Sequence, residues 1–438
     1  MTDRIAAATE LTRAAVESLS ARLDEPAWCR DRRLAAFEVF ERTSWPTTRD
    51  ERWRRTDLSG LPVDRLRPAV EGAPDPLPAA VRMALDSLKP AGGVLVQRNA
   101  TTVSTEVDAD LAAAGVVFSD VHAAVRNHPD LIRQYMHHLI PPDDGKFQAL
   151  HAALWAGGTF VYVPAGVEVA LPLLALSWAD ADDAAFFPPV LVIAGRGSRV
   201  TLITRAGVGT GTGRALAVPV VEIHCGEGAA VRHVLVSDWG RQAWEIGSLR
   251  ARVERDATFH SLLVGLGGAV VATTVESILA GPGASSEMLG VVFGDGTQHF
   301  DIHTLQEHAA PHTLSDLLYK NAVAGRAVSS FIGMIRVHPG AQKTNAFQSN
   351  RNLILSDAAR AISDPKLEIM ANDLRCTHGS ATSRLNEEHL FYLMSRGLPR
   401  QDAIRMVVEG FFAELLDRVP LEPLRERLRS EIAARMTL

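Results

Sequence analysis

Cys376 and His378 are the residues whose types and spacing suggest metal chemistry most directly. They stand two positions apart in the segment Cys376-Thr377-His378-Gly379. A thiolate and an imidazole are borderline-soft donors that suit iron, zinc or copper. On an extended strand two such residues face the same side, so both can reach one ion. The residue types also fit a second interpretation, in which Cys376 is a small buried hydrophobe and His378 a capped loop histidine.

The surrounding residues predict a change from strand to helix at this pair. Leu367 and Ile369 alternate with polar neighbours as in a strand. Asn386 is a plausible helix N-cap that is followed by two acidic residues, and Gly397 is a C-terminal stop. Two further apolar stripes follow, and we expect the tail helices to pack mainly against one another: Ile404, Val407, Val408, Phe411 and Leu415, then Leu421, Leu424, Leu428 and Ile432.

The middle of the chain, from Phe147 to about Asp364, is a repeat. Short runs of β-branched residues alternate with turns whose first residues recur every 27 to 31 positions, as subtraction of their numbers gives: Gly166, Gly197, Gly228, Asp256, Gly283, His312 and Gly340. Such a period indicates a solenoid, and no long helical segment intervenes to cross over between parallel strands. We therefore predict an all-β core formed by a parallel β-helix. Its exposed ends need covers, and the flanking helical segments are natural caps.

Three domains are predicted from these patterns. Residues 1–145 form an N-terminal helical and α/β domain, with a helix from about Ala27 to Arg42 and a short strand from Val94 to Gln97. Residues 146–384 form the β-helix core, and residues 385–438 form a C-terminal helical domain.

Composition and charge exclude several classes of protein. The chain has 438 residues, 47% of them hydrophobic, so it can bury a large core, and its net charge of −6 with a pI near 6.2 argues against a nucleic-acid partner. Its three cysteines are far apart, which indicates neither a disulfide framework nor a zinc knuckle. Neither a secretory signal nor a membrane-spanning run is evident, so we expect a cytoplasmic protein without a membrane partner.

Four histidines, His299, His303, His308 and His312, form a further cluster in the repeat. At roughly 3.3 Å per residue in a strand they span more than one coordination sphere. We interpret them as polar and turn-forming residues of the solenoid.

Several long segments resemble one known family. They are PKLEIMANDLRCTHGSATSRLNEEHLFYLMSRGL (365–398), AQKTNAFQSNRNLILSDAARAISDP (341–365), HTLSDLLYKNAVAGRA (312–327) and, near the amino terminus, PTTRDERWRRTDL (46–58). They are similar to segments of the SufB/SufD family, the β-helical scaffold proteins of the Suf iron–sulfur cluster assembly system. The resemblance runs from about Lys146 to Val419.

The resemblance implies a right-handed β-helix and a role as a non-enzymatic scaffold. It implies that the last turns pair with a SufB-type chain and that the C-terminal helices hold the SufC ATPase. Iron or a transient iron–sulfur cluster would then lie at the partner interface, with His378 and Cys376 as metal ligands of this chain, and a reduced flavin can take part in the complex.

The branch of the family follows from one missing thiol. SufB-type chains carry a cysteine in the strand that matches 345–353, whereas this chain has Ser349 and Asn350 there. The Cys-x-His-Gly form of Cys376 to Gly379 is similar to SufD, although LFYLMSRGL is closer to SufB. The chain is therefore most like SufD.

Two alternatives remain open at this point. The chain can be a self-sufficient SufB-like scaffold that forms a homodimer when alone. It can also be a β-helix enzyme that acts on polysaccharides, although fold alone is weak evidence for an activity.

Overall fold

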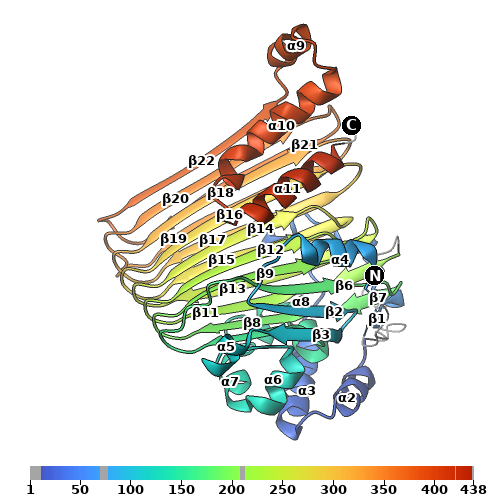
Figure 1. Ribbon diagram of the computed structural model, residues 1–438, viewed down its shortest axis with the longest axis vertical. Helices are drawn as coiled ribbons and strands as arrows, with labels where there is room; N and C mark the ends of the chain where they lie inside the picture. The colour runs from blue at the N-terminus through green and yellow to red at the C-terminus, as the bar shows by residue number, and fades with distance from the viewer. Residues whose placement is uncertain (1–10, 70–76, 208–212, 420, 437–438) are drawn as a thin grey trace.

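The protein is described here by a computed structural model that covers residues 11–69, 77–207, 213–419 and 421–436. Most of the chain winds into a solenoid of parallel strands, stacked along the long axis of the molecule (Figure 1). Each turn contributes one strand to each of two sheets, and the described residues make about eight turns. The predicted parallel β-helix between an α/β segment and a helical segment is therefore confirmed.

The two sheets follow the order of the turns. The first sheet contains β4 (Val117–Ser119), β5 (Thr159–Val163), β8 (Pro189–Ala194), β11 (Val220–Cys225), β13 (Ala243–Val253), β15 (Val270–Leu279), β17 (His299–His308), β19 (Val328–Val337) and β21 (Arg360–Ile369). The second sheet contains β3 (Thr101–Val107), β2 (Gly93–Arg98), β6 (Leu173–Trp178), β9 (Arg199–Ala206), β12 (Ala230–Ser237), β14 (Thr258–Gly265), β16 (Ser285–Gly294), β18 (Leu314–Val323), β20 (Asn345–Ile354) and β22 (Arg375–Arg384). Three short strands form a side branch of the first sheet: β1 (Arg67–Pro68), β7 (Ala184–Phe186) and β10 (Ala215–Ala217).

The predicted repeat residues lie at the turns and adopt left-handed backbone angles. Gly197 and Gly228 have φ of 67° and 66°, and Asp256 and His312 have φ of 53° and 59°. Glycine adopts this region without the steric cost that a β-carbon brings. Gly340 is the exception: in the longer connection from Val337 to Asn345 the left-handed residue is Lys343, with φ of 61°.

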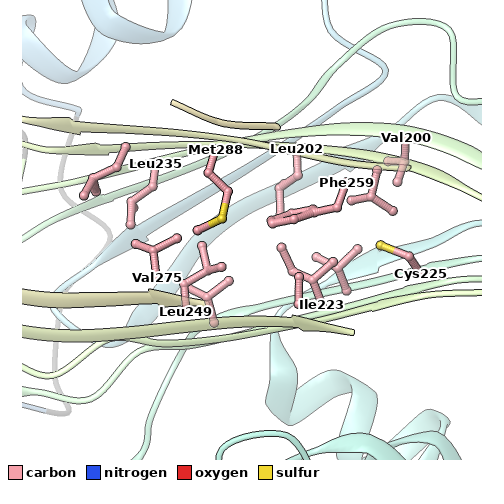
Figure 2. Close-up of a cluster of buried hydrophobic side chains, with 14 of the residues drawn as sticks. Val200, Leu202, Ile223, Cys225, Leu235, Leu249, Phe259, Val275 and Met288 are labelled. Carbon is pink, nitrogen blue, oxygen red and sulfur yellow. The ribbon is translucent and has the colours of Figure 1, made fainter. Parts of the chain in front are cut away.

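The solenoid core lies between the sheets. Along each strand alternate residues point inward, as in β15, where buried and half-buried residues alternate over all ten positions. The labelled side chains of Figure 2 come from both sheets and point toward one another; they include Leu202, Ile223, Phe259 and Met288. Burying a side chain of this size contributes about 1.5–3 kcal/mol, so the column holds the turns together.

The N-terminal segment covers the first turn. Strand β2 pairs with β6 and strand β4 with β5, so this segment extends both sheets of the solenoid. Helix α3 has the predicted bounds, Ala27–Arg42, and its buried Arg33 forms an ion pair of 2.6 Å with Glu25. The remaining elements here are α2 (Arg13–Arg22), η1 (Glu51–Trp53), η2 (Leu58–Gly60), η3 (Val63–Arg65), α4 (Ala79–Asp86), α5 (Ala109–Ala113), α6 (Val121–Asn127), α7 (Pro129–Tyr135), η4 (Pro142–Asp144) and α8 (Lys146–Leu154).

The C-terminal helices do not cap the solenoid, and this part of the prediction was wrong. Helices α10 (Arg400–Leu416) and α11 (Glu422–Arg435) lie along the second sheet, while α9 (Glu387–Ser395) projects beyond the last turn (Figure 1). Their apolar stripes pack on outward-facing residues of the sheet as well as on one another: Leu318, Ala322 and Leu353 share one buried cluster with Val408, Phe412 and Leu428. The last turn is therefore left without a helical cover.

Candidate functional site at the open end of the solenoid

Cys376 and His378 lie on β22, the last strand of the second sheet. Cys376 pairs with Ala346 and His378 with Gln348 of β20, and both of these partners are buried inside the solenoid. The two donors therefore occupy inward-facing positions on the same side of β22, as the spacing predicts. The alternative of a loop histidine is wrong, because His378 lies within the strand.

The two candidate ligands differ in exposure. Cys376 is half-buried and packs against a small cluster that includes Ile335, Val337 and Ala346, whereas His378 is exposed. Burial raises the pKa of the Cys376 thiol above its ordinary value. A metal ion would therefore have to displace a proton from this thiol before it could bind.

Strands β21 and β22 form an open end. In the described part of the chain each is the last strand of its sheet, so one side of its backbone has no strand partner. The inward side chains of this last turn are consequently exposed: Leu367 is 39% and Ile369 is 41% accessible. An uncovered pair of parallel edge strands next to apolar side chains is typical of a surface that another chain covers.

Strand β20 shows what lies beneath this end. Ser349 and Asn350 lie in the segment where SufB-type chains carry a cysteine. Asn350 is buried and faces inward, whereas Ser349 faces outward. The Nδ2 of Asn352 donates to the Oδ1 of Asn350 at 2.8 Å, and the Nδ2 of Asn321 donates to the Oδ1 of Asn352 at 3.0 Å. A further bond of 3.3 Å joins the Nδ2 of Asn352 to Thr382 on β22. This ladder of amides was not predicted from the sequence. The feature that could have predicted it is the pair of asparagines, Asn321 and Asn352, which stand one repeat apart.

The residues of one chain cannot enclose a metal ion by themselves. Among the described residues no group of three or more His, Cys, Asp or Glu side chains is arranged to hold a metal. The open end offers two donors, and the remaining ligands would have to come from a molecule that covers it.

The histidines of the repeat lie in separate environments. His303 contacts the buried Asp301 at 3.3 Å on the outer face of β17, where Thr56 of the N-terminal segment also donates to Asp301 at 2.6 Å. His308 lies inside the solenoid, with its ring nitrogens 2.7 Å and 2.8 Å from the hydroxyls of Thr313 and Ser315. These contacts fit the structural interpretation.

A second exposed apolar surface lies on the projecting helix. Phe391 is 74% and Tyr392 is 56% accessible on α9, and Met394 and Met406 are also exposed. Only Leu390 of α9 is buried. Asn386 caps this helix as predicted, since its Oδ1 accepts from the backbone N–H of Glu388 at 2.8 Å. None of the helices in the described ranges is long and apolar enough to span a membrane.

Comparison with known proteins gives two family matches that together cover most of the chain. Residues 177–411 match the model described as "SUF system FeS cluster assembly, SufBD core domain", and residues 22–174 match the "SufBD protein N-terminal region". The iron-sulfur cluster assembly protein SufD of Bacillus subtilis is 30% identical over 422 residues, which are 95% of this chain and 96% of the relative. SufB of the same organism is 28% identical over 425 residues, 94% of this chain and 90% of the relative. A SufBD family protein of Staphylococcus epidermidis is 28% identical over 428 residues, which are 94% of this chain and 90% of the relative.

Proposed function

Because this chain belongs to the SufBD family of iron–sulfur cluster assembly proteins, we propose that it is a non-enzymatic scaffold subunit of the SufD type. In this proposal the open end pairs with a SufB-type chain, and α9 with the start of α10 binds a SufC-type ATPase. The iron, or the cluster, is cargo that is assembled where the two chains meet. A cytoplasmic location follows from this role.

The open end is the observation that carries the proposal. It combines two edge strands, exposed apolar side chains and two inward-facing donor groups at one place. Two donors are too few for an iron site, so a second chain that covers this end and brings a cysteine would both bury the edges and complete the ligand set. His378 is the more accessible of the two donors, and we assign it the larger role.

The SufD type is supported by β20 rather than by overall identity, because relatives named SufB and SufD match almost equally well. The segment 345–353 has no cysteine, and its inward-facing Asn350 and Asn352 are held in a ladder of amides. A chain without this thiol depends on its partner for it. Pairing of two identical copies remains the second candidate, because the same open end is available to a second copy.

The proposed docking surface for the ATPase rests on the exposed side chains of α9. Large aromatic residues are enriched at the centres of protein interfaces, and Phe391 and Tyr392 are more than half accessible on a helix that projects from the body. The helices α10 and α11 support this surface by packing on the second sheet.

Co-expression with SufB-type and SufC-type partners, followed by affinity and size-exclusion chromatography, tests both surfaces. We expect Ile369→Asp to lose the SufB-type chain but keep the ATPase, and Phe391→Asp to do the reverse. Leu171→Asp is the matched control, since Leu171 is 42% exposed, as Ile369 is 41%, and lies at the other end of the solenoid. Loss of both partners in either variant, or of neither, would contradict the assignment. Analysis of the purified complex for flavin tests the further expectation that a reduced flavin takes part.

A further inference from the structure

The later turns of the solenoid contain polar side chains whose hydrogen-bonding atoms lack protein partners. Each of these residues is less than 9% accessible, and among the described residues no group bonds to its hydroxyl or amide oxygen: Ser261, Ser277, Ser286, Thr304, Gln306, Tyr319, Asn321, Ser329 and Gln348. They come from seven successive strands: β14, β16, β18 and β20 of the second sheet, and β15, β17 and β19 of the first.

Strand register places all of these atoms inside the solenoid. Ser286 pairs with Phe259, Ser329 with Phe300, and Thr304 with Val275, and each of these partners belongs to the apolar core. Side chains at paired positions of parallel strands stack on the same face. The unpaired oxygens therefore point into the interior between the sheets, where they lie among apolar side chains such as Phe259 and Met288 of Figure 2.

The same columns lose side-chain volume toward the open end. One runs from Phe259 through Ser286 and Ser315 to Ala346. A second, on the opposite sheet, runs from Phe300 through Ser329 to Ala361. In these two columns the phenyl ring of one turn is therefore followed by the smaller side chains of serine and alanine.

Polar atoms in such a place are satisfied by water in native proteins. An unpaired buried hydroxyl or amide is destabilising, and more than nine in ten buried polar groups have a protein or water partner. Buried waters typically make about three hydrogen bonds to groups of this kind. We propose that the interior of the solenoid from β14 to β20 binds a column of ordered water molecules.

The mouth of this column lies under the candidate metal ligand. Met288, Leu317, Gln348 and His378 occupy one register column, so the unpaired Oε1 of Gln348 lies one strand below the imidazole. Water bound at Gln348 would offer His378 a hydrogen-bond partner from the solenoid interior, in addition to the solvent at the open end. This inference does not depend on which partner covers the open end.

A crystal structure of the full chain at about 1.8 Å or better tests the proposal directly. We expect ordered water within hydrogen-bonding distance of the oxygens of Gln306, Asn321, Ser329 and Gln348. Direct protein–protein hydrogen bonds to these atoms, with no water density between the sheets, would overturn the proposal.

Thermal unfolding of two serine variants gives an independent test. Ser329→Ala removes an inward hydroxyl without a protein partner, and Ser315→Ala removes one that already bonds to His308 at 2.8 Å and Gln306 at 2.7 Å. If water satisfies Ser329, both variants should lower Tm, by about 1–2 °C each for a chain of this size. A Tm that rises in Ser329→Ala while it falls in Ser315→Ala would mean that the interior is dry and would reject the column.

Discussion

Lys320→Met is expected to loosen α10 from the second sheet. The Lys320 side chain is 4% exposed; its Nζ donates to the backbone oxygen of Phe411 at 2.8 Å and to the carboxylate of Glu414 at 2.6 Å. Methionine keeps the length and the apolar stem but removes the charged donor. A buried hydrogen bond from a charged group contributes about 1.5–3 kcal/mol, whereas the ion pair with the carboxylate of Glu414, which is partly exposed to water, adds about 0–1 kcal/mol.

Hydrogen–deuterium exchange of the α10 amides is the appropriate assay, because a helix can open locally without unfolding the solenoid. A loss of about 2 kcal/mol corresponds to exchange that is faster by a factor of roughly 10 to 100. Arg351→Met is the matched control: Arg351 contacts the same carboxylate at 2.8 Å but is 47% exposed, so its removal should change exchange by less than about fivefold.

The two variants should also differ in their response to pH. The hydrogen bond from Lys320 lowers the pKa of Glu414 below its ordinary value of 4.5. The stabilisation from the charged carboxylate is therefore fully present above pH 4.5 and is lost as the pH falls through the lowered value. The effect of Arg351→Met should vanish there, while that of Lys320→Met persists through the bond to Phe411. Equal effects of the two variants at neutral pH would refute the reasoning.

Three further predictions concern the solenoid and its open end. Gly290→Ala should cost about 1–3 kcal/mol, measured by urea unfolding, because its new Cβ would lie 2.1 Å from the ring of Tyr319; Gly340→Ala, with open space at that position, should be nearly neutral. Gly197→Val should cost about 1–3 kcal/mol in the same assay, since valine is strained at a φ of 67°. Zinc binding to the isolated chain, which offers only two donors, should be weak, and its affinity, measured by calorimetry, should rise from pH 6 to 8 more steeply than that of Cys376→Ala, because burial raises the pKa of Cys376 and the metal must displace its proton; equal pH dependence of the two proteins would remove the thiol from the ligand set.

The sequence is sufficient to predict the solenoid because its turns are local. Each turn needs a residue that tolerates a left-handed backbone, and these residues recur at a period that can be read directly, from Gly166 to His312. Helix α3 was predicted with its observed bounds for the same reason, since the features that define a helix are local. The last predicted turn, which begins at Gly340, has its left-handed residue at Lys343 instead, because the connection there is longer.

Contacts between distant segments could not be predicted in this way. The apolar stripes of the tail helices predict their packing on one another, but they do not reveal that the same stripes also cover outward-facing residues of β18 and β20, such as Leu318 and Leu353. The hydrogen bond between Thr56 and Asp301 joins residues 245 positions apart, and sequence periodicity cannot predict a contact of this kind.

The candidate site was predictable in its geometry but not in its surroundings. Alternation along a strand is sufficient to place Cys376 and His378 on one face. Their different exposure arises because no strand of the described chain stacks on β22. His378 is therefore exposed to solvent, while the cluster around Ile335 and Val337 partly covers Cys376. The amide ladder of Asn321 and Asn352 depends on strand register, which the sequence does not specify residue by residue.

Cluster formation by the His378→Ala variant tests the central claim most directly. The variant would be co-expressed with SufB-type and SufC-type partners, and the visible absorbance of the purified complex would be compared with those of wild type, Cys376→Ala and Thr377→Ala. Thr377 is the control because it lies on the same strand and faces outward. We predict normal subunit stoichiometry in all four complexes, a strong loss of cluster absorbance in His378→Ala, a smaller loss in Cys376→Ala and none in Thr377→Ala. Full cluster absorbance in a correctly assembled His378→Ala complex would contradict the assignment of the open end as the assembly site.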